Sequence, residues 1–231
     1  MNKNEMDNTQ NAHDKQVLSH IYDEVKRRFT GIDDLAHGWE HVKRVYDMAE
    51  QIARQEGADM FVVGAAALLH DLGRAAPPEI AQDVAEHHAD LSVYTAKVLL
   101  REQHVSQERQ EAILHAILAH SFSRGVEPHT LEARIVRDAD RLDALGAIGI
   151  LRWAITGVVR HTPHSYYPED PFGEQRTLDD TRYMLDHFPR KLLRLEETML
   201  TATGRALAHQ RTAFMRQYLV EFRRELEIHF S

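Results

Sequence analysis

The stretch Ala65–Gly73, AAALLHDLG, runs from an apolar segment directly into an imidazole and a carboxylate. It closes a predicted helix, Met60–Leu69, that is apolar on nearly every face, and Asp59 precedes that helix as a candidate N-cap. A helix that is apolar all round belongs at the centre of a fold. Burying His70 and Asp71 without partners would cost several kcal/mol. The rest of the chain must therefore supply groups that bind them.

Apolar residues recur with a helical period in most of the remaining chain, and the alternation typical of strands is absent. The periodicity predicts helices over 17–29, 34–56, 83–103, 106–120 and 130–156, with two more after the segment 161–177. Residue 33 or 34 is the expected N-cap of the second helix, and residues 1 to about 15 are expected to be frayed. Segment 161–177 is a long loop rich in Pro and aromatic residues, a candidate lid. We expect an all-α chain of about eight helices forming a single domain, 1–231, with a core at about 34–153 and C-terminal helices at 178–230.

The composition narrows the classes of function. The 231 residues are 43% hydrophobic and 28% charged, as in ordinary globular proteins. A net charge of -8 argues against a nucleic-acid polymer as partner, and the lack of cysteine excludes disulfides and thiolate ligands. No apolar run approaches 18 residues and the N-terminus is polar, so we expect a cytoplasmic location and no membrane partner.

Four polar residues interrupt apolar helical faces: His41, His70, Asp71 and Asp140. Two imidazoles and two carboxylates from three helices suit a divalent cation (Mn, Mg, Fe, Ni or Co) better than a structural zinc ion. Such a set leaves two octahedral positions for water or a phosphate oxygen. Taken singly, each of the four is more typical of a hydrogen-bonded polar residue of the core or of a surface side chain, and it is the set of four that favours a metal site.

Three segments resemble, in order, the motifs of the HD superfamily of metal-dependent phosphohydrolases. They are HGWEHVKRV at 37–45, LLHDLG at 68–73 and RIVRDADRLDALGAIG at 134–149. The resemblance covers about 34–153, and segments further along resemble a bacterial subgroup related to nucleotide pyrophosphohydrolases. It implies an HD-domain helical bundle with a C-terminal helical extension, and His41, His70, Asp71 and Asp140 as metal ligands.

The resemblance also implies roles in catalysis. Asp71 or Asp140 would orient the attacking water as well as bind the metal, and Arg44 would neutralise charge on the phosphoryl group. In related cyclic-nucleotide phosphodiesterases, the first histidine of an H-x-x-x-H pair protonates the leaving oxygen, which here is His37. Asp143 is a candidate residue of the substrate site, where it would hold Arg44 or a ligand histidine in place.

Two further histidines are candidates for binding substrate or a second metal. His115 and His120 are five residues apart, about 140° around a helix, so only one can face a given point, and His120 is favoured. His87 and His88 are weaker candidates.

The sequence therefore predicts a metal-dependent phosphohydrolase of a small phosphorylated metabolite, with a nucleotide as the favoured substrate, acting as a triphosphate pyrophosphohydrolase or a phosphatase. The alternatives are a phosphodiesterase of the same superfamily, a non-catalytic regulator that binds metal and nucleotide, and a helical adaptor. The oligomeric state is left open, with a homodimer among the options.

Overall fold

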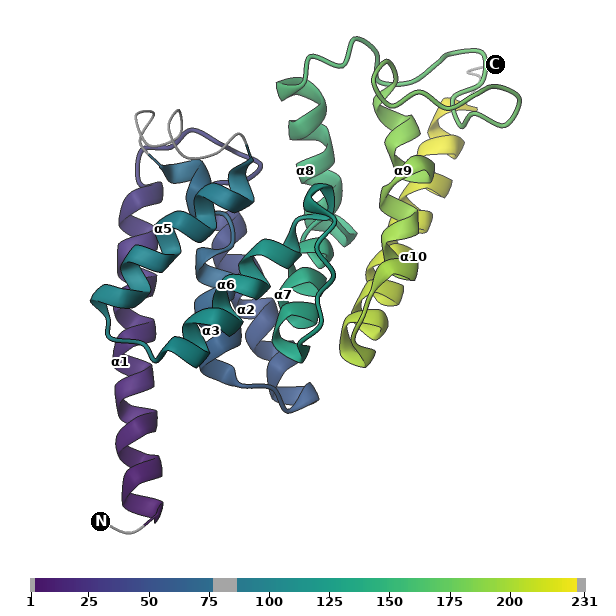
Figure 1. The fold of residues 1–231 in the computed structure, drawn as a ribbon. Coiled ribbons are helices and arrows are strands. Elements are labelled where there is room, and N and C mark those ends of the chain that lie inside the picture. Colours follow the sequence, from purple (N-terminus) through teal and green to yellow (C-terminus); the bar gives the residue numbers. More distant parts are fainter. Residues whose placement is uncertain (1–2, 77–86, 228–231) are drawn as a thin grey trace. The chain divides into compact units, whose positions relative to one another are not determined.

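The protein is described by a computed structural model that covers residues 3–76 and 87–227, with side chains from residue 9 on (Figure 1). Within these ranges the chain is helical, and the extended pairing is limited to a single bridge between His164 and Tyr183. The all-α prediction is confirmed. The α-helices are α1 (Lys3–Phe29), α2 (Trp39–Glu56), α3 (Met60–Leu69), α5 (His88–Glu102), α6 (Gln107–His120), α7 (Leu131–Leu142), α8 (Gly146–Val159), α9 (His187–Arg190) and α10 (Ala202–Leu226).

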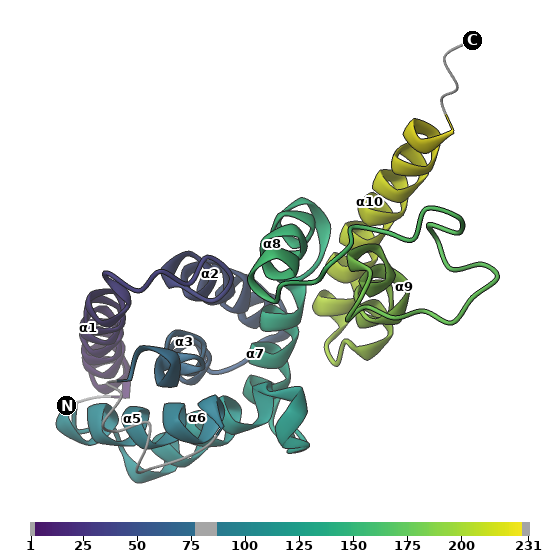
Figure 2. The same cartoon turned by 90° about the horizontal axis from the view of Figure 1, so that it is seen from above.

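The chain divides into two compact units, 1–140 and 141–231. The first unit is built around α3, whose residues from Phe61 to Leu69 are all buried. Helices α1, α2 and α6 pack directly on α3, and Figure 2 shows α3 enclosed by its neighbours in this unit. Asp59 accepts hydrogen bonds from the backbone N–H groups of Phe61 and Val62, which confirms the predicted N-cap. The organisation of the whole chain as one domain stays a prediction.

Two helices begin at other residues than the sequence predicts. Helix α1 starts at Lys3, so the expectation of a frayed segment up to about residue 15 is wrong; Asp14 pairs with Arg109 of α6 at 2.8 Å. Helix α2 starts after Gly38 instead of after residue 33 or 34. The carboxylate of Asp34 instead accepts the backbone N–H groups of the next turn, those of residues 36 and 37, both at 2.9 Å.

One predicted helix is divided in two, and the predicted start of another lies outside the described residues. Residues 77–86 lie outside the described ranges, so the predicted start of the helix at 83 is not assessed, and α5 is described from His88. The predicted helix 130–156 is broken into α7 and α8. The break ends at Gly146, whose φ of +74° is favoured only for glycine, because a Cβ there is strained in the left-handed region.

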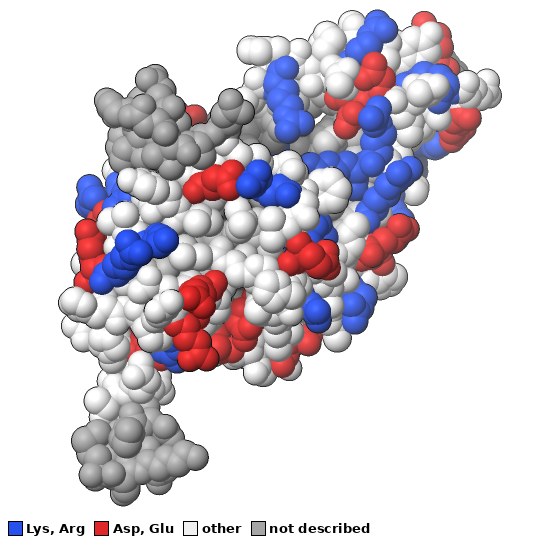
Figure 3. Space-filling view, viewed as in Figure 1, with Lys and Arg blue, Asp and Glu red and all other residues white. Residues whose placement is uncertain are grey.

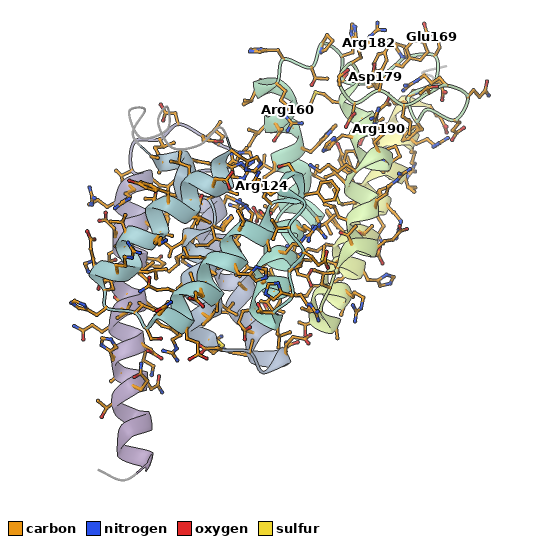
Figure 4. The ribbon with its side chains drawn as sticks, in the orientation of Figure 1. Arg124, Arg160, Glu169, Asp179, Arg182 and Arg190 are labelled. Atoms are coloured by element: carbon orange, nitrogen blue, oxygen red, sulfur yellow. The ribbon has the colours of Figure 1, made fainter. Side chains whose placement is uncertain are left out.

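The second unit contains α8, α9 and α10 with two short 3-10 helices, η3 (Met184–Asp186) and η4 (Leu192–Thr198). Helix α10 packs on α8 and η4, and α9 packs on η3 and η4. The loop before η3 is held by Arg176, which makes two hydrogen bonds of 2.7 Å to the buried carboxylate of Asp186. Figure 4 labels Asp179 and Arg182 of this loop, and Figure 3 shows Lys and Arg side chains interspersed with Asp and Glu on the visible face.

Among the described residues, no single helix combines the length and the apolar character needed to cross a membrane. Only α7 and α8 taken together, across the break between them, reach that length and composition.

Candidate metal centre

Helix ends bring the central residues together. His41 lies in the first turn of α2, His70 caps the C-terminus of α3, and Asp71 follows it at the start of the 3-10 helix η1 (Leu72–Ala75). All three side chains are almost completely buried. One donor atom from each lies within 4.8 Å of the others. The structure thus places three of the four predicted metal ligands in one cluster.

The distances within this cluster are within about 1 Å of those between adjacent ligands of one cation. The Nε2 atoms of His41 and His70 are 3.3 Å apart, and each is 3.8 Å from Oδ2 of Asp71. Adjacent ligands of an octahedral ion with bonds of about 2.1 Å are separated by about 3 Å. Oδ1 of Asp140, the fourth predicted ligand, is 3.4 Å from Nε2 of His41, and its side chain is partly exposed. Asp140 thus lies next to His41 but outside the group of three whose donor atoms all lie within 4.8 Å of one another, and its place as the fourth ligand stays a prediction.

Hydrogen bonds set the tautomers of two histidines. Nδ1 of His70 is 2.7 Å from the carbonyl oxygen of Ala67, and Nδ1 of His120 contacts the carbonyl oxygen of Ile117 in the same way. A carbonyl oxygen only accepts, so Nδ1 carries the proton in both rings. Each Nε2 then presents a lone pair to the cluster, which is the form in which histidine binds a metal.

Asp71 faces two pairs of histidines with its two oxygens. Oδ2 faces His41 and His70, while Oδ1 lies 3.7 Å from Nε2 of His88 and 3.8 Å from Nε2 of His120. Asp71, His88 and His120 form a second group with donor atoms within 4.8 Å. Oδ1 is buried and has no hydrogen-bond partner among the described residues. An unsatisfied buried carboxylate oxygen is costly, so the chemistry of this atom fits a cation ligand.

The electrostatics of the cluster favour cation binding. Burial raises the pKa of Asp71, but the charges of His70 and Arg74 more than offset this and hold that pKa below its usual range. Burial lowers the pKa of His70 to about 4 and that of His88 also to about 4. Burial also raises the pKa of Asp140, and the hydrogen bond from His41 brings it well below the usual value. Near neutral pH the imidazoles of His70 and His88 are thus neutral and the carboxylates of Asp71 and Asp140 ionised, as metal ligation requires.

Two residues of the cluster were missed or discounted by the sequence analysis. Arg74 was missed: its Nε donates to Oδ2 of Asp71 at 2.8 Å and so holds the carboxylate in place. The signal was its position three residues after Asp71. His88 was a weak candidate, because its approach to Asp71 depends on the packing of α5 against η1.

Of the other predicted site residues, some lie near the cluster and others make contacts elsewhere. His37 is close to the cluster, with its ring centroid 5.9 Å from that of His41, and Arg44 is half-buried on α2 one turn after His41. His115 stacks instead on His129, at 3.7 Å between centroids, so of the two candidate histidines of α6 it is His120 that joins the cluster. Asp143 belongs to the second unit and pairs with Arg152 at 2.7 Å. The predicted partnership of Asp143 with Arg44 or with a ligand histidine stays a prediction.

A buried cluster of histidines and aspartates at the helix ends of an all-α unit is the arrangement expected of an HD domain, and residues 38–145 match the HD domain family. The chain is 34% identical to the uncharacterised protein YpgQ of Bacillus subtilis over 195 residues, 82% of this chain and 84% of that protein. It therefore belongs to the HD superfamily.

Solved structures agree with this assignment. An HD-superfamily hydrolase of Bacillus thuringiensis superposes with a TM-score of 0.72 at 30% identity, covering 94% of this chain and 100% of that one. YpgQ of Bacillus subtilis in complex with ADP superposes with a TM-score of 0.67 at 30% identity, covering 92% of this chain and 96% of that one.

Proposed function

We propose that this chain is a metal-dependent phosphohydrolase whose substrate is a nucleotide. The observation that carries the proposal is Asp71, a buried carboxylate whose two oxygens each face two imidazoles while Oδ1 has no hydrogen-bond partner among the described residues. The ADP bound to the similar protein YpgQ supports a nucleotide as the substrate class.

The donor set accommodates one or two divalent cations. His41, His70 and Asp71 would hold the first, with Asp140 as the fourth ligand, and His88 and His120 would hold a second that shares Asp71. Oxygen and imidazole ligands without thiolate fit Mn, Mg, Fe, Ni or Co. A bound cation supplies a Lewis acid that neutralises phosphate charge and activates water for attack on phosphorus.

The protein's own residues orient this chemistry. Arg74 fixes the Asp71 carboxylate through Nε, and the carbonyl oxygens of Ala67 and Ile117 fix the rings of His70 and His120. We assign Asp140, ionised and partly exposed, to orienting the attacking water. His37, beside His41, is the proposed donor of a proton to the leaving oxygen, and Arg44 the proposed contact to the phosphoryl group.

The test measures bound metal and turnover together. The full chain, purified without chelator, is assayed for Mn, Mg, Fe, Ni and Co content. It is then screened with nucleoside mono-, di- and triphosphates and with phosphodiesters, with phosphate and pyrophosphate measured separately. We expect release of phosphate or pyrophosphate by the wild type, and loss of both metal and turnover in Asp71→Asn.

The matched control is Asp47→Asn, which changes an exposed carboxylate on α2 that pairs with Lys43. It is expected to keep both metal and activity. Turnover by a metal-free Asp71→Asn protein would refute the proposal. A wild type that binds metal and nucleotide but releases no product would be a regulator instead, and one that cleaves only phosphodiesters would be a phosphodiesterase.

A further inference from the structure

The second group of ligands comes from three separate elements. Asp71 precedes η1, His88 is the first residue of α5, and His120 is the last residue of α6. Nε2 of His88 lies 3.7 Å, and Nε2 of His120 3.8 Å, from Oδ1 of Asp71. Two ligands with bonds of about 2.2 Å to one ion can be at most about 4.4 Å apart. The group therefore holds a cation only if other contacts fix the three elements to within about 1 Å.

One hydrogen bond fixes α5 against η1. The backbone N–H of Gly73 donates to Oγ of the buried Ser92 at 2.8 Å. Ser92 lies one turn after His88 on α5, so this bond sets how closely His88 approaches Asp71. It involves neither α6 nor the segment after it. The separation between His88 and the end of α6 must be set by other contacts.

A chain of side-chain hydrogen bonds joins the start of α5 to the end of α6. Nδ1 of His87 accepts the backbone N–H of Ala89 at 3.2 Å, so Nε2 carries the proton. Nε2 thus donates to Oγ of Ser123 at 2.6 Å, and Oγ of Ser123 lies 3.1 Å from Oγ of Ser121. Ser121 is buried and follows His120 directly. The chain therefore runs between the neighbours of the two histidine ligands.

A salt bridge and a ring contact reinforce this connection. Arg124, labelled in Figure 4, pairs with Asp90 in the first turn of α5 at 3.0 Å. The ring of His87 stacks on that of His88, with centroids 4.4 Å apart. The 3-10 helix η2 (Phe122–Arg124), which follows α6, is thus tied to the start of α5 at two consecutive residues.

We infer that His87 and Ser123 are positioning residues for the second cation, because their hydrogen bond holds His88 and His120 at the separation that a shared ion needs. This inference rests on the proposed function, in which the second group binds a cation. The ligands of the first cation are almost completely buried and come from α2 and the end of α3. Changes at His87 or Ser123 therefore weaken the second cation and spare the first.

The test follows binding of Mn²⁺ to the full chain by calorimetric titration and by electron paramagnetic resonance. Loss of a side chain that orients a metal ligand weakens metal binding about 10- to 100-fold. We expect the Kd of the second Mn²⁺ to rise by this factor in Ser123→Ala, while the Kd of the first stays as in the wild type. The resonance signal of a coupled Mn²⁺ pair should disappear in this variant at metal concentrations that maintain it in the wild type.

Two further variants separate the hydrogen bond from the bulk of the side chains. Ser123→Thr keeps the hydroxyl and should restore binding of the second Mn²⁺. His87→Phe keeps a ring that can stack on His88 but has no N–H to donate, so it should weaken the second Mn²⁺ at least as much as Ser123→Ala.

Ser106→Ala is the matched control. Ser106 precedes the other end of α6, is exposed, and makes no side-chain capping hydrogen bond within the described part of the chain. This variant should bind both ions as the wild type does.

Three outcomes would overturn the inference. A wild type that binds two Mn²⁺ ions, with an unchanged second Kd in Ser123→Ala, would refute the positioning role alone. Equal weakening of both ions in Ser123→Ala would show a general loss of structure in place of a local role. A wild type that binds a single Mn²⁺ would refute the second cation together with this inference, whereas the hydrolase proposal would still be decided by turnover with one metal.

Discussion

Gly73, which follows the His-Asp pair by two residues, sets the distance between the two groups of ligands. A Cβ built on it would lie 2.4 Å from the carbonyl oxygen of His88 and 2.7 Å from the backbone nitrogen of Ser92. Both atoms belong to the backbone at the start of α5, so they cannot move aside by a side-chain rotation. The Gly73 N–H also donates to Oγ of the buried Ser92 at 2.8 Å. Gly73→Ala must therefore push α5 away from η1.

The size of the displacement follows from these contacts. Raising the contact of 2.4 Å to an ordinary 3.4 Å requires a shift of about 1 Å. Along the line from Nε2 of His88 to Oδ1 of Asp71, this lengthens 3.7 Å to about 4.7 Å. Two ligands with bonds of about 2.2 Å to one ion can be at most about 4.4 Å apart. Gly73→Ala should therefore lose the second cation and keep the first.

The free energy of unfolding of Gly73→Ala should fall as well. Overpacking costs about 1–3 kcal/mol and a lost buried hydrogen bond about 1 kcal/mol. At about 2–4 °C per kcal/mol, the Tm of the metal-free protein should drop by about 5–15 °C. The assays are metal stoichiometry after dialysis against Mn²⁺ and thermal unfolding in EDTA.

Gly64→Ala is the control for this prediction. A Cβ at position 64 meets only the ends of the Leu18 and Tyr46 side chains, at 3.3 and 3.4 Å. Since alanine also favours a helix over glycine, the free energy of unfolding should stay within about 1 kcal/mol of the wild type. Wild-type stoichiometry and Tm in Gly73→Ala would show that the packing of α5 on η1 does not set the second group.

Three further predictions concern stability. The pKa of His70 is about 4 in the folded protein, below its ordinary value of about 6.5, so the unfolded state binds more protons. In metal-free protein the protonation of His70 alone should thus remove about 3 kcal/mol of unfolding free energy as pH falls from 6.5 to 4, measured by denaturant unfolding, and a pH-independent stability would contradict this. Arg176→Met leaves the buried Asp186 carboxylate without its cation and should cost about 3–5 kcal/mol of unfolding free energy, most of it recovered in Arg176→Met/Asp186→Leu; equal losses in both variants would be evidence against the pairing. Asp59→Ala removes the N-cap of α3 and should lower the free energy of unfolding by about 1 kcal/mol in the same measurement. An unchanged unfolding midpoint would mean that the cap does not stabilise the protein.

The sequence by itself determined the central helix and the chemistry at its end. Residues 61–69 are apolar on all faces, which leaves no side for solvent, and this property is local and readable from spacing alone. The types of ligand and their attachment to helices followed from the motifs, and the angle between His115 and His120 required that only one of them join the cluster.

Only the tertiary structure decided which oxygen of Asp71 faces which pair of histidines, and that His88 belongs to the cluster. His88 approaches Asp71 because α5 packs on η1 at Gly73. These two segments are separated along the chain, so the apolar period of either helix does not predict their contact. The break at Gly146 was likewise not readable from the sequence pattern. The apolar period continues through 130–156, but the left-handed backbone conformation of Gly146 interrupts the helix. Local periodicity reports which face of a helix is buried, whereas the partner of that face is set by long-range packing.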